Sequence, residues 1–296
     1  MDGIDVIDQI VANGPHPAEH AASGAKILIF VPMYNCANQI SRVIAQFTFP
    51  LQRRFTKLIL VDNRSTDGGV EKAAAAIATL TEIDVDILRN NENYGLGGSH
   101  KVAFSKAIEQ GFDYVIVLHG DDQGAIADII PCLDRGLHTE VDCLLGARFM
   151  RGSELRGYSA FRTFGNRVFN LLFSIAARQR LYDLGSGLNL YSVGALKDKA
   201  WLTFPDDLTF NYYMILASAA KGWRMRFFPL TWREEDQRSN VKLFRQAGKV
   251  TAILLSFIAR PRRFLTADWR AVPGRSYGAE TVAQVRRVKQ AEAGPQ

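Results

Sequence analysis

Short, continuous runs of apolar residues recur through the first half of the chain, and stretches with helical spacing separate them. Unbroken apolar runs of this length are typical of strands that are buried on both faces of a sheet. The predicted strands are 27–31, 58–61, 85–88, 114–118 and 142–145, and the predicted helices between them are 40–47, 70–78, 101–110 and 126–135. This alternation predicts an α/β fold with a doubly wound, mostly parallel sheet and flanking helices.

The pattern changes after Gly146, where longer helical stretches replace the regular alternation. Helices are expected at 161–177 and 210–220, and strands at 188–191 and 225–228. We divide the chain into three parts: a lead segment with the spacing of a short amphipathic helix, an α/β domain, and a C-terminal extension expected to be an amphipathic helical region. Their bounds are 1–24, 25–240 and 241–296.

Basic residues are concentrated in the C-terminal extension. The whole chain has a net charge of +6, but between Lys242 and Lys289 eleven Lys and Arg face two acidic residues, Asp268 and Glu280. A local excess of this kind suits contact with an anionic surface. Nucleic acid is not the expected partner, because no motif interleaves aromatic residues with the basic ones.

Two apolar segments with basic flanks, 168–177 and 250–259, suit helices that lie in the headgroup plane of a membrane. Both are shorter than the roughly 18 apolar residues of a spanning helix, and two core helices with solvated ends would show the same pattern. The start of the chain lacks the basic and apolar pattern of a secretory signal, and the three cysteines are far apart. We therefore expect a cytoplasmic protein with reduced thiols, bound peripherally at the inner face of the membrane.

Polar residues gather where the predicted strands end. Pro32, Tyr34 and Asn35 follow the first strand, and Asp62 and Asn63 follow the second. Ligands of open α/β sheets bind beyond the carboxyl ends of the strands, so these loops are the candidate site. A tyrosine there can stack on a base, and a carboxylate can accept hydrogen bonds from a ribose or a base. The same residues also suit ordinary turns and helix caps.

The loop after the third predicted strand is rich in glycine. Gly95, Gly97 and Gly98 would let the backbone approach a ligand, and their N–H groups would face a phosphate at a helix start. An ordinary glycine-rich turn has the same composition. The loop lacks a complete G-x-G-x-x-G and follows the third strand rather than the first, which argues against a nicotinamide-binding domain.

The fourth predicted strand runs directly into the sequence His119-Gly120-Asp121-Asp122-Gln123. Two adjacent carboxylates after a buried strand are hard to explain by packing, although acidic residues also favour helix N-termini. Mg²⁺ and Mn²⁺ prefer oxygen ligands and keep water and substrate phosphates around them, so one or two carboxylates are enough. A metal here would neutralise the charge on a departing diphosphate.

Taken in order, these loops resemble those of family 2 glycosyltransferases with the GT-A fold, especially the dolichyl-phosphate mannose synthase-like branch. The matching segments are 31–35, 61–68, 93–98, 117–123, 146–148 and 183–188. The resemblance implies a GT-A domain that takes a sugar from a nucleoside-diphosphate donor and inverts its anomeric centre, with Mg²⁺ or Mn²⁺ as cofactor.

The resemblance also implies roles for individual residues. The donor-binding residues would be Pro32, Tyr34, Asn35, Asp62, Asn63, Gly95, Gly97, Gly98, Gln123, Arg238 and Lys242. The last two belong to a basic stretch that would close over the donor phosphates. The metal ligands would come from Asp121, Gln123 and His119, the catalytic residues would be Asp121, Asp122 and Asp183, and the acceptor-binding residues would be Arg148, Ser186 and Gly187.

The metal loop departs from the family pattern, which is usually Asp-x-Asp. With Gln123 aligned, Asp121 stands at the second aspartate and His119 at the first. Three roles are open to His119: a metal ligand, a phosphate contact, or a residue that fills space. Asp122 is an alternative second carboxylate.

A second departure concerns the base. Where many family members have a Glu-Asp pair that deprotonates a sugar hydroxyl, this chain has Phe210-Asn211; the nearby acids are Asp206, Asp207 and 234–236. A phosphate is already anionic at neutral pH and needs little help from a base. The sequence thus favours a polyprenyl-phosphate acceptor, a lipid phosphate. The alternatives are a sugar hydroxyl in glycan synthesis, a nucleotidyltransferase, and a non-catalytic nucleotide-sugar-binding protein.

Overall fold

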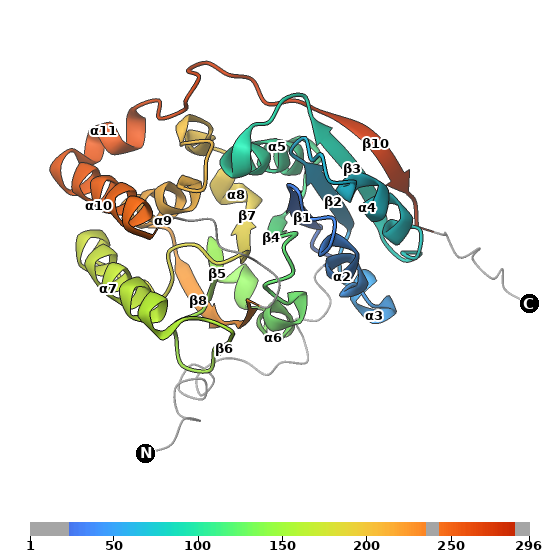
Figure 1. Ribbon diagram of the computed structural model, residues 1–296, viewed down its shortest axis with the longest axis horizontal. Coiled ribbons are helices and arrows are strands. Elements are labelled where there is room, and N and C mark those ends of the chain that lie inside the picture. The colour runs from blue at the N-terminus through green and yellow to red at the C-terminus, as the bar shows by residue number, and fades with distance from the viewer. Residues whose placement is uncertain (1–23, 235–242, 288–296) are drawn as a thin grey trace, which may run out of the picture.

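The computed structural model describes residues 24–234 and 243–287, built around an eight-stranded sheet (Figure 1). The strand order is β10-β3-β2-β1-β4-β7-β5-β8. The strands are β1 (Ile27–Met33), β2 (Lys57–Asp62), β3 (Asp84–Asn90), β4 (Tyr114–Leu118), β5 (Cys143–Ala147), β7 (Leu188–Ser192), β8 (Met225–Pro229) and β10 (Ala279–Val285). Because β7 and β10 alone in this sheet run against the others, the prediction of a mostly parallel sheet is confirmed.

Helices cover both faces of this sheet (Figure 1). One layer consists of α2 (Ile40–Ala45), α3 (Phe49–Gln52), α4 (Gly69–Ile77), the 3-10 helices Ile126–Ile129 and Leu137–Thr139, and α6 (Ile130–Asp134). The other consists of α5 (Gly95–Glu109), α7 (Ala160–Ala177), α8 (Val193–Leu196), the 3-10 helix Ala200–Thr203, α9 (Phe210–Ala220), α10 (Leu243–Ala259) and α11 (Pro261–Thr266). A small second sheet pairs β6 (Glu154–Arg156) with β9 (Thr231–Arg233).

The unbroken apolar runs of the strands follow from this two-sided burial. In β1, Leu28 and Phe30 pack into the layer that contains α5, whereas Ile29 and Val31 pack into the layer that contains α2. Successive strand residues point to opposite faces, so every position must be apolar when both faces are covered. The predicted lead helix falls in 1–23, outside the described residues.

The C-terminal extension is helical as far as Thr266, and then its character changes. β10 pairs antiparallel with β3 and closes that edge of the sheet, so the expectation of a wholly helical extension was wrong for this part. An edge strand is held mainly by its backbone hydrogen bonds and needs few large apolar residues. The sequence of β10 therefore lacks the apolar run that marks the central strands.

The two apolar segments with basic flanks differ in burial. In α10, four apolar side chains are buried in the core, Val250, Ile253, Leu254 and Phe257. Most large apolar side chains of α7 are exposed instead. No helix in the described ranges is long and apolar enough to cross a bilayer.

Candidate active site

Strand pairing brings the polar loops together at one edge of the sheet. Met33 at the end of β1 lies opposite Asp62 at the end of β2. Leu118, the last residue of β4, lies opposite Leu188, the first residue of β7. The antiparallel β7 thereby places the loop 183–187 beside the loop 119–123, and the His119 N–H donates to the Gly187 carbonyl at 2.9 Å.

Arg148 joins this cluster from the end of β5. Its Nε and Nη2 donate to the two carboxylate oxygens of Asp183, each at 2.8 Å, and its backbone N–H donates to the same carboxylate. The guanidinium also lies over the Trp232 ring, 4.9 Å from its centroid. A two-pronged pair of this kind fixes both partners in position. The predicted catalytic Asp183 and the predicted acceptor-binding Arg148 therefore act as one unit.

The two adjacent aspartates of the metal loop have different surroundings. Asp122 adopts a left-handed backbone, with φ of 58°, and its carboxylate accepts hydrogen bonds from Arg42 Nε at 2.7 Å and Gln46 Nε2 at 3.1 Å. Both partners belong to or adjoin α2. These contacts tie Asp122 to α2, so the structure favours a positioning role for it over the predicted catalytic role.

A bound cation would stabilise the charged form of the Asp121 carboxylate. Burial raises the pKa of its carboxyl to about 6, because the charged form is poorly solvated there. One of its oxygens accepts the Gln123 N–H at 3.3 Å. Asp121 thus remains the prediction for the metal ligand.

His119 is the second candidate donor in this loop. Burial, together with the positive charge of Arg148, lowers the pKa of its imidazole to about 4, so the ring is neutral at physiological pH. Its buried Nε2 has no hydrogen-bond partner among the described residues. An unsatisfied, neutral imidazole nitrogen can bind a divalent cation through its lone pair or, in the other tautomer, donate its N–H to a phosphate oxygen. The described residues hold no group of three metal-ligating side chains, so most of a metal's ligands would come from diphosphate and water.

The first two loops are joined by hydrogen bonds. The Asn35 N–H donates to Ser65 Oγ at 3.0 Å, and Asn35 Oδ1 accepts the Thr66 N–H at 2.9 Å. Tyr34, the residue before Asn35, is 55% exposed and presents a ring on which a base can stack. Pro32 is buried, and its carbonyl accepts the Gly120 N–H at 3.2 Å, which ties the first loop to the metal loop.

Asp62 and Asn63 are buried at the end of β2. The Asp62 carboxylate accepts the Ser65 N–H at 3.0 Å and Arg89 Nε at 3.2 Å. Arg89 is thus a neighbour of the predicted nucleoside pocket that the sequence did not suggest.

Asn63 is held by the loop that follows β3. Its Oδ1 accepts the Tyr94 N–H at 2.7 Å and Asn90 Nδ2 at 3.0 Å, and its Nδ2 donates to Asn93 Oδ1 at 2.8 Å. These bonds bind two loops of the protein together. The geometry supports a structural role for Asn63 rather than the predicted donor contact.

The glycines that follow β3 leave room for another segment of the protein's own backbone to pack against them. The Gly97 and Gly98 N–H groups donate to the Asp206 carbonyl at 2.7 and 3.3 Å. A Cβ on Gly95 would lie 2.5 Å from the same carbonyl oxygen. The prediction that these N–H groups face a phosphate was therefore wrong, because the segment 205–206 occupies that place.

The remaining predicted residues fall in three situations. Ser186 is buried, and its Oγ donates to the Leu188 carbonyl and Asn189 Oδ1 at the start of β7. Gln123 is half-buried, and its carbonyl accepts the Arg233 N–H at 3.0 Å. Arg238 and Lys242 lie outside the described residues. Trp232, whose ring lies under the Arg148 guanidinium, was missed, because it belongs to the short strand β9 and not to one of the polar loops at the strand ends.

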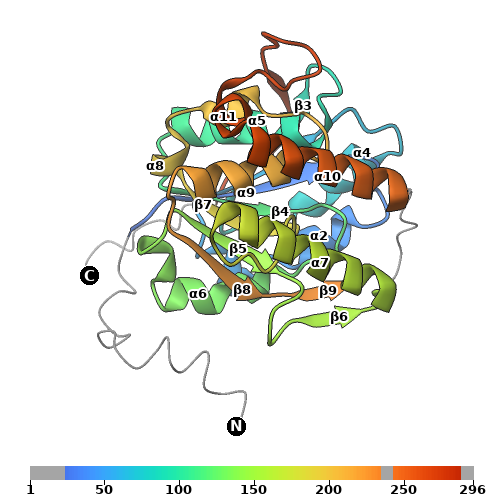
Figure 2. The same cartoon turned by 90° about the vertical axis from the view of Figure 1, so that its left-hand side faces the viewer.

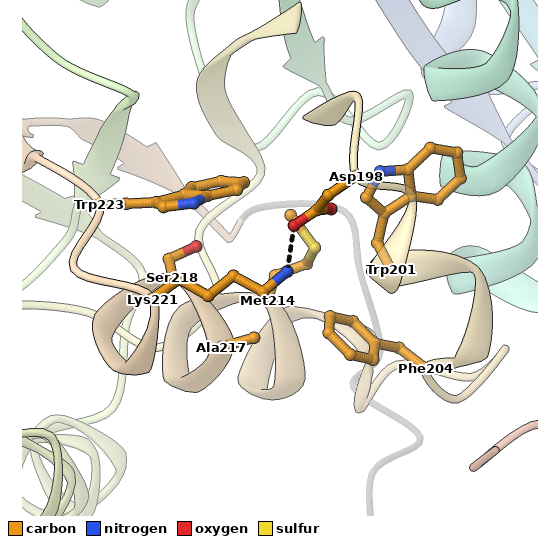
Figure 3. Close-up of a pocket in the computed structure, with 8 residues that line it drawn as sticks. All are labelled: Asp198, Trp201, Phe204, Met214, Ala217, Ser218, Lys221 and Trp223. Carbon is orange, nitrogen blue, oxygen red and sulfur yellow. Dashed lines mark hydrogen bonds and ion pairs between the residues drawn. The ribbon is translucent and has the colours of Figure 1, made fainter. Parts of the chain in front are cut away.

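One small hollow lies apart from these loops, between α9 and the segment that precedes it (Figure 3). Its volume is about 10 Å³, and Lys221 and Asp198 form an ion pair at its rim. A space of this size holds roughly one water molecule. It is therefore a packing defect and offers no room for a substrate.

Comparison with known protein families identifies the family of this chain. Residues 28–198, more than half of the chain, match the family described as glycosyl transferase family 2. The chain belongs to glycosyl transferase family 2. It is accordingly a glycosyltransferase, and the alternatives of a nucleotidyltransferase and a non-catalytic binder are set aside.

Individual relatives are distant. UDP-N-acetylglucosamine–dolichyl-phosphate N-acetylglucosaminyltransferase of Methanococcus voltae is 22% identical over 181 residues, which cover 58% of this chain and 71% of that protein. An uncharacterised protein of Methanocaldococcus jannaschii is 25% identical over 211 residues, which cover 66% and 83%. Among solved structures, glucosyl-3-phosphoglycerate synthase of Mycobacterium tuberculosis, with Mn²⁺, UDP-glucose and glycerol 3-phosphate, has a TM-score of 0.57 at 16% identity and covers 80% of this chain and 81% of that one. This likeness supports the GT-A fold.

Proposed function

We propose that this glycosyltransferase moves a sugar from a uridine-diphosphate donor to a lipid phosphate, with inversion and with the help of Mn²⁺ or Mg²⁺. The proposal places the enzyme near the dolichyl-phosphate mannose synthase-like branch of its family. The observation that supports it most is the presence of an asparagine, Asn211, at the start of α9. Its side chain lies 3.5 Å from the position that a Cβ on Gly185 would take, and Gly185 is two residues from Asp183. A carboxamide cannot take a proton from an acceptor hydroxyl.

Among the described residues, the neighbouring acids Asp206, Asp207 and Glu234 do not substitute for a base at this place; Glu235 and Asp236 lie outside the described residues. Asp206 is paired with Lys101 at 2.6 Å, and Glu234 is paired with Arg162 at 2.5 Å. Asp207 accepts hydrogen bonds from the Thr209 N–H and hydroxyl. Each of these carboxylates is therefore already engaged by other groups of the protein. An acceptor that already carries negative charge, such as a phosphate, is the chemistry that this arrangement favours.

In the proposed reaction, an acceptor phosphate oxygen forms a bond to the anomeric carbon while the bond from that carbon to the donor diphosphate breaks on the opposite face. A bound metal would supply positive charge to the leaving diphosphate. Asp121 would hold that metal, with His119 as a second donor. Asp183 would hold Arg148 in place near the acceptor, and Tyr34 would stack on the base.

The choice of donor rests on the relatives. The name of the Methanococcus enzyme contains a uridine-diphosphate sugar and dolichyl phosphate, and the solved glucosyl-3-phosphoglycerate synthase is in complex with UDP-glucose. The two likenesses agree on the nucleotide and differ on the acceptor. We follow the Methanococcus enzyme for the acceptor because of Asn211.

Matched acceptors test this proposal. The purified enzyme would be incubated with radiolabelled UDP-sugars, Mn²⁺, and either a polyprenyl phosphate or the polyprenol of the same chain length. We expect labelled lipid with the phosphate and none with the alcohol. Transfer to the alcohol at a similar rate, or transfer to a small sugar hydroxyl instead, would overturn the proposed acceptor class.

A further inference from the structure

The outer face of α7 carries an exposed apolar stripe. Its members follow helical spacing, with one adjacent pair at 171–172, and are between 39% and 69% exposed: Phe161, Phe164, Val168, Leu171, Leu172 and Ile175. The opposite face of the helix packs into the core through Phe173 and Phe169. Figure 2 shows α7 on the same side of the molecule as α10. A continuous exposed stripe of this size on an otherwise packed helix marks a binding surface.

A groove runs along the C-terminal half of this helix, which we call the α7 groove. Its volume is about 610 Å³, and it lies open at the surface of the protein. The chain builds it by turning back at Arg178, whose backbone is left-handed, so that 179–182 runs beside α7. Asn170 Nδ2 donates to the Tyr182 carbonyl at 2.6 Å, and the Leu181 N–H donates to Ser174 Oγ at 2.9 Å. The groove is therefore a fixed part of the fold.

The α7 groove is basic as well as apolar. Arg167, Arg178 and Arg180 line it beside Leu171 and Ile175 of the stripe, and none of its lining residues is acidic. Among the described residues, no carboxylate forms an ion pair with any of these three arginines. Three uncompensated guanidinium groups at the border of an apolar stripe match a surface whose phosphates lie above hydrocarbon.

The groove also adjoins the candidate acceptor site. Two of its lining residues, Phe149 and Tyr182, are the chain neighbours of Arg148 and Asp183, which form the buried ion pair. A phosphate-bearing surface held in the groove would lie next to the loops where the acceptor is expected. The α7 groove is therefore placed to hold a membrane surface beside the candidate acceptor site.

We propose that the α7 groove binds the phosphate headgroups of an acidic phospholipid bilayer while the apolar stripe of α7 enters the acyl boundary, which docks the acceptor site on the membrane. This inference rests on the proposed lipid-phosphate acceptor and assigns the docking surface to α7 rather than α10. Arg167, Arg178 and Arg180 provide the selectivity for acidic lipid, and the stripe provides the apolar contact.

Vesicle sedimentation tests the groove directly. The full chain would be mixed with vesicles of phosphatidylcholine alone and with vesicles that also contain phosphatidylglycerol. We expect strong binding to the mixed vesicles and weak binding to the neutral ones. Because each arginine near an anionic surface contributes about fivefold to partitioning, the double variant Arg178→Gln/Arg180→Gln should bind roughly twenty-five-fold more weakly.

A matched control removes the same charge elsewhere. Lys72 and Arg135 are exposed on the layer that contains α4 and α6, so Lys72→Gln/Arg135→Gln should keep wild-type binding. Leu171→Gln/Ile175→Gln should weaken binding to the mixed vesicles through the stripe. Equal losses in the groove variant and the control would show a general charge effect and overturn the proposal. So would equal binding to neutral vesicles, or a dimer in solution that Leu171→Gln/Ile175→Gln dissociates.

A second readout separates this inference from the proposed function. Release of UDP from a UDP-sugar in the absence of lipid depends on the donor site, and the groove variant should leave it unchanged. Loss of vesicle binding with normal UDP release supports the groove. Normal vesicle binding in an enzyme that does not use polyprenyl phosphate would overturn the acceptor class and leave the docking surface standing.

Discussion

Arg148 and Asp183, 35 residues apart in the chain, form a buried ion pair in which two guanidinium nitrogens each donate to one carboxylate oxygen at 2.8 Å. The Asp183 side chain is 2% exposed and that of Arg148 is 13% exposed. The pair ties the end of β5 to the loop that leads into β7. Those two segments meet at the edge of the sheet where the metal loop begins.

Removing one partner of this pair should lower the free energy of unfolding. Asp183→Asn leaves a buried guanidinium without its counter-charge, and we expect the free energy of unfolding to fall by about 3–5 kcal/mol in urea denaturation. The exposed pair of Arg156 and Glu154, with side chains 59% and 62% exposed, is the matched control. Glu154→Gln should change stability by less than about 1 kcal/mol. Similar small losses in both variants would show that Arg148 and Asp183 do not depend on each other.

Stability should fall in mild acid because of a buried histidine. His100 is 2% exposed, and burial lowers the pKa of its imidazole from 6.5 to about 3. Between these two values the unfolded chain binds a proton that the folded chain does not, so stability is full above pH 6.5 and declines as the pH falls. At pH 5 the loss from this group should be roughly 2 kcal/mol.

The measurement is a pair of urea titrations at pH 7 and pH 5 on the wild type and on His100→Gln. We expect the wild type to lose more stability between the two pH values than the variant does. His119, whose pKa is also lowered by burial, is present in both proteins; it contributes to the lowered pKa of His100, so the difference between the proteins reports His100 together with this coupling. Equal losses in the two proteins would contradict the assignment to His100.

The glycines in the first turn of α5 should be required for folding. A Cβ on Gly97 would lie 2.8 Å from the Phe210 Cβ and closer still to the Pro205 carbonyl oxygen. We expect Gly97→Ala to lower the free energy of unfolding by about 2–3 kcal/mol, because backbone must move to relieve the clash. Gly165→Ala, on α7 with nothing within 4 Å, should instead raise it by about 0.5–1 kcal/mol.

Donor binding, measured by calorimetry, is a second test of the role of Gly97. The folded fraction of Gly97→Ala should bind the donor with an affinity close to that of the wild type, because the Gly97 N–H donates to protein and not to phosphate. A variant that folds normally but binds donor poorly would restore the phosphate-binding role.

The central fold follows from the sequence because double-sided burial leaves a strong pattern. Every residue of β1 is buried, and a run of seven such residues stands out among polar loops. β10 has no such pattern, since an edge strand exposes most of its side chains. Its pairing partner β3 lies far away in the chain, and only the folded backbone brings the two together.

The site was predictable in place but not in detail. The rule that ligands bind beyond the carboxyl ends of strands located the loops after β1, β2 and β4. It could not show which way adjacent side chains point. Asp121 and Asp122 are equivalent in the sequence, and the left-handed backbone at Asp122 sends its carboxylate to Arg42. Likewise, the segments in α7 and α10 have similar compositions, and packing alone decides that α10 buries four large apolar side chains while α7 fully buries only Phe173.

Because Asp121 and Asp122 have different surroundings, replacing each of them tests most directly whether Asp121 holds the metal. The sugar-transfer rates of Asp121→Asn and Asp122→Asn would be measured side by side over a range of Mn²⁺ concentrations. We predict that Asp121→Asn lowers the rate by about a hundredfold or more, the usual loss when one charge-stabilising group is removed from an active site. Asp122→Asn should stay within about tenfold of the wild type at saturating Mn²⁺, since its carboxylate serves Arg42 and Gln46. Equal losses in the two variants, or a larger loss in Asp122→Asn, would contradict the assignment of the metal chemistry to Asp121.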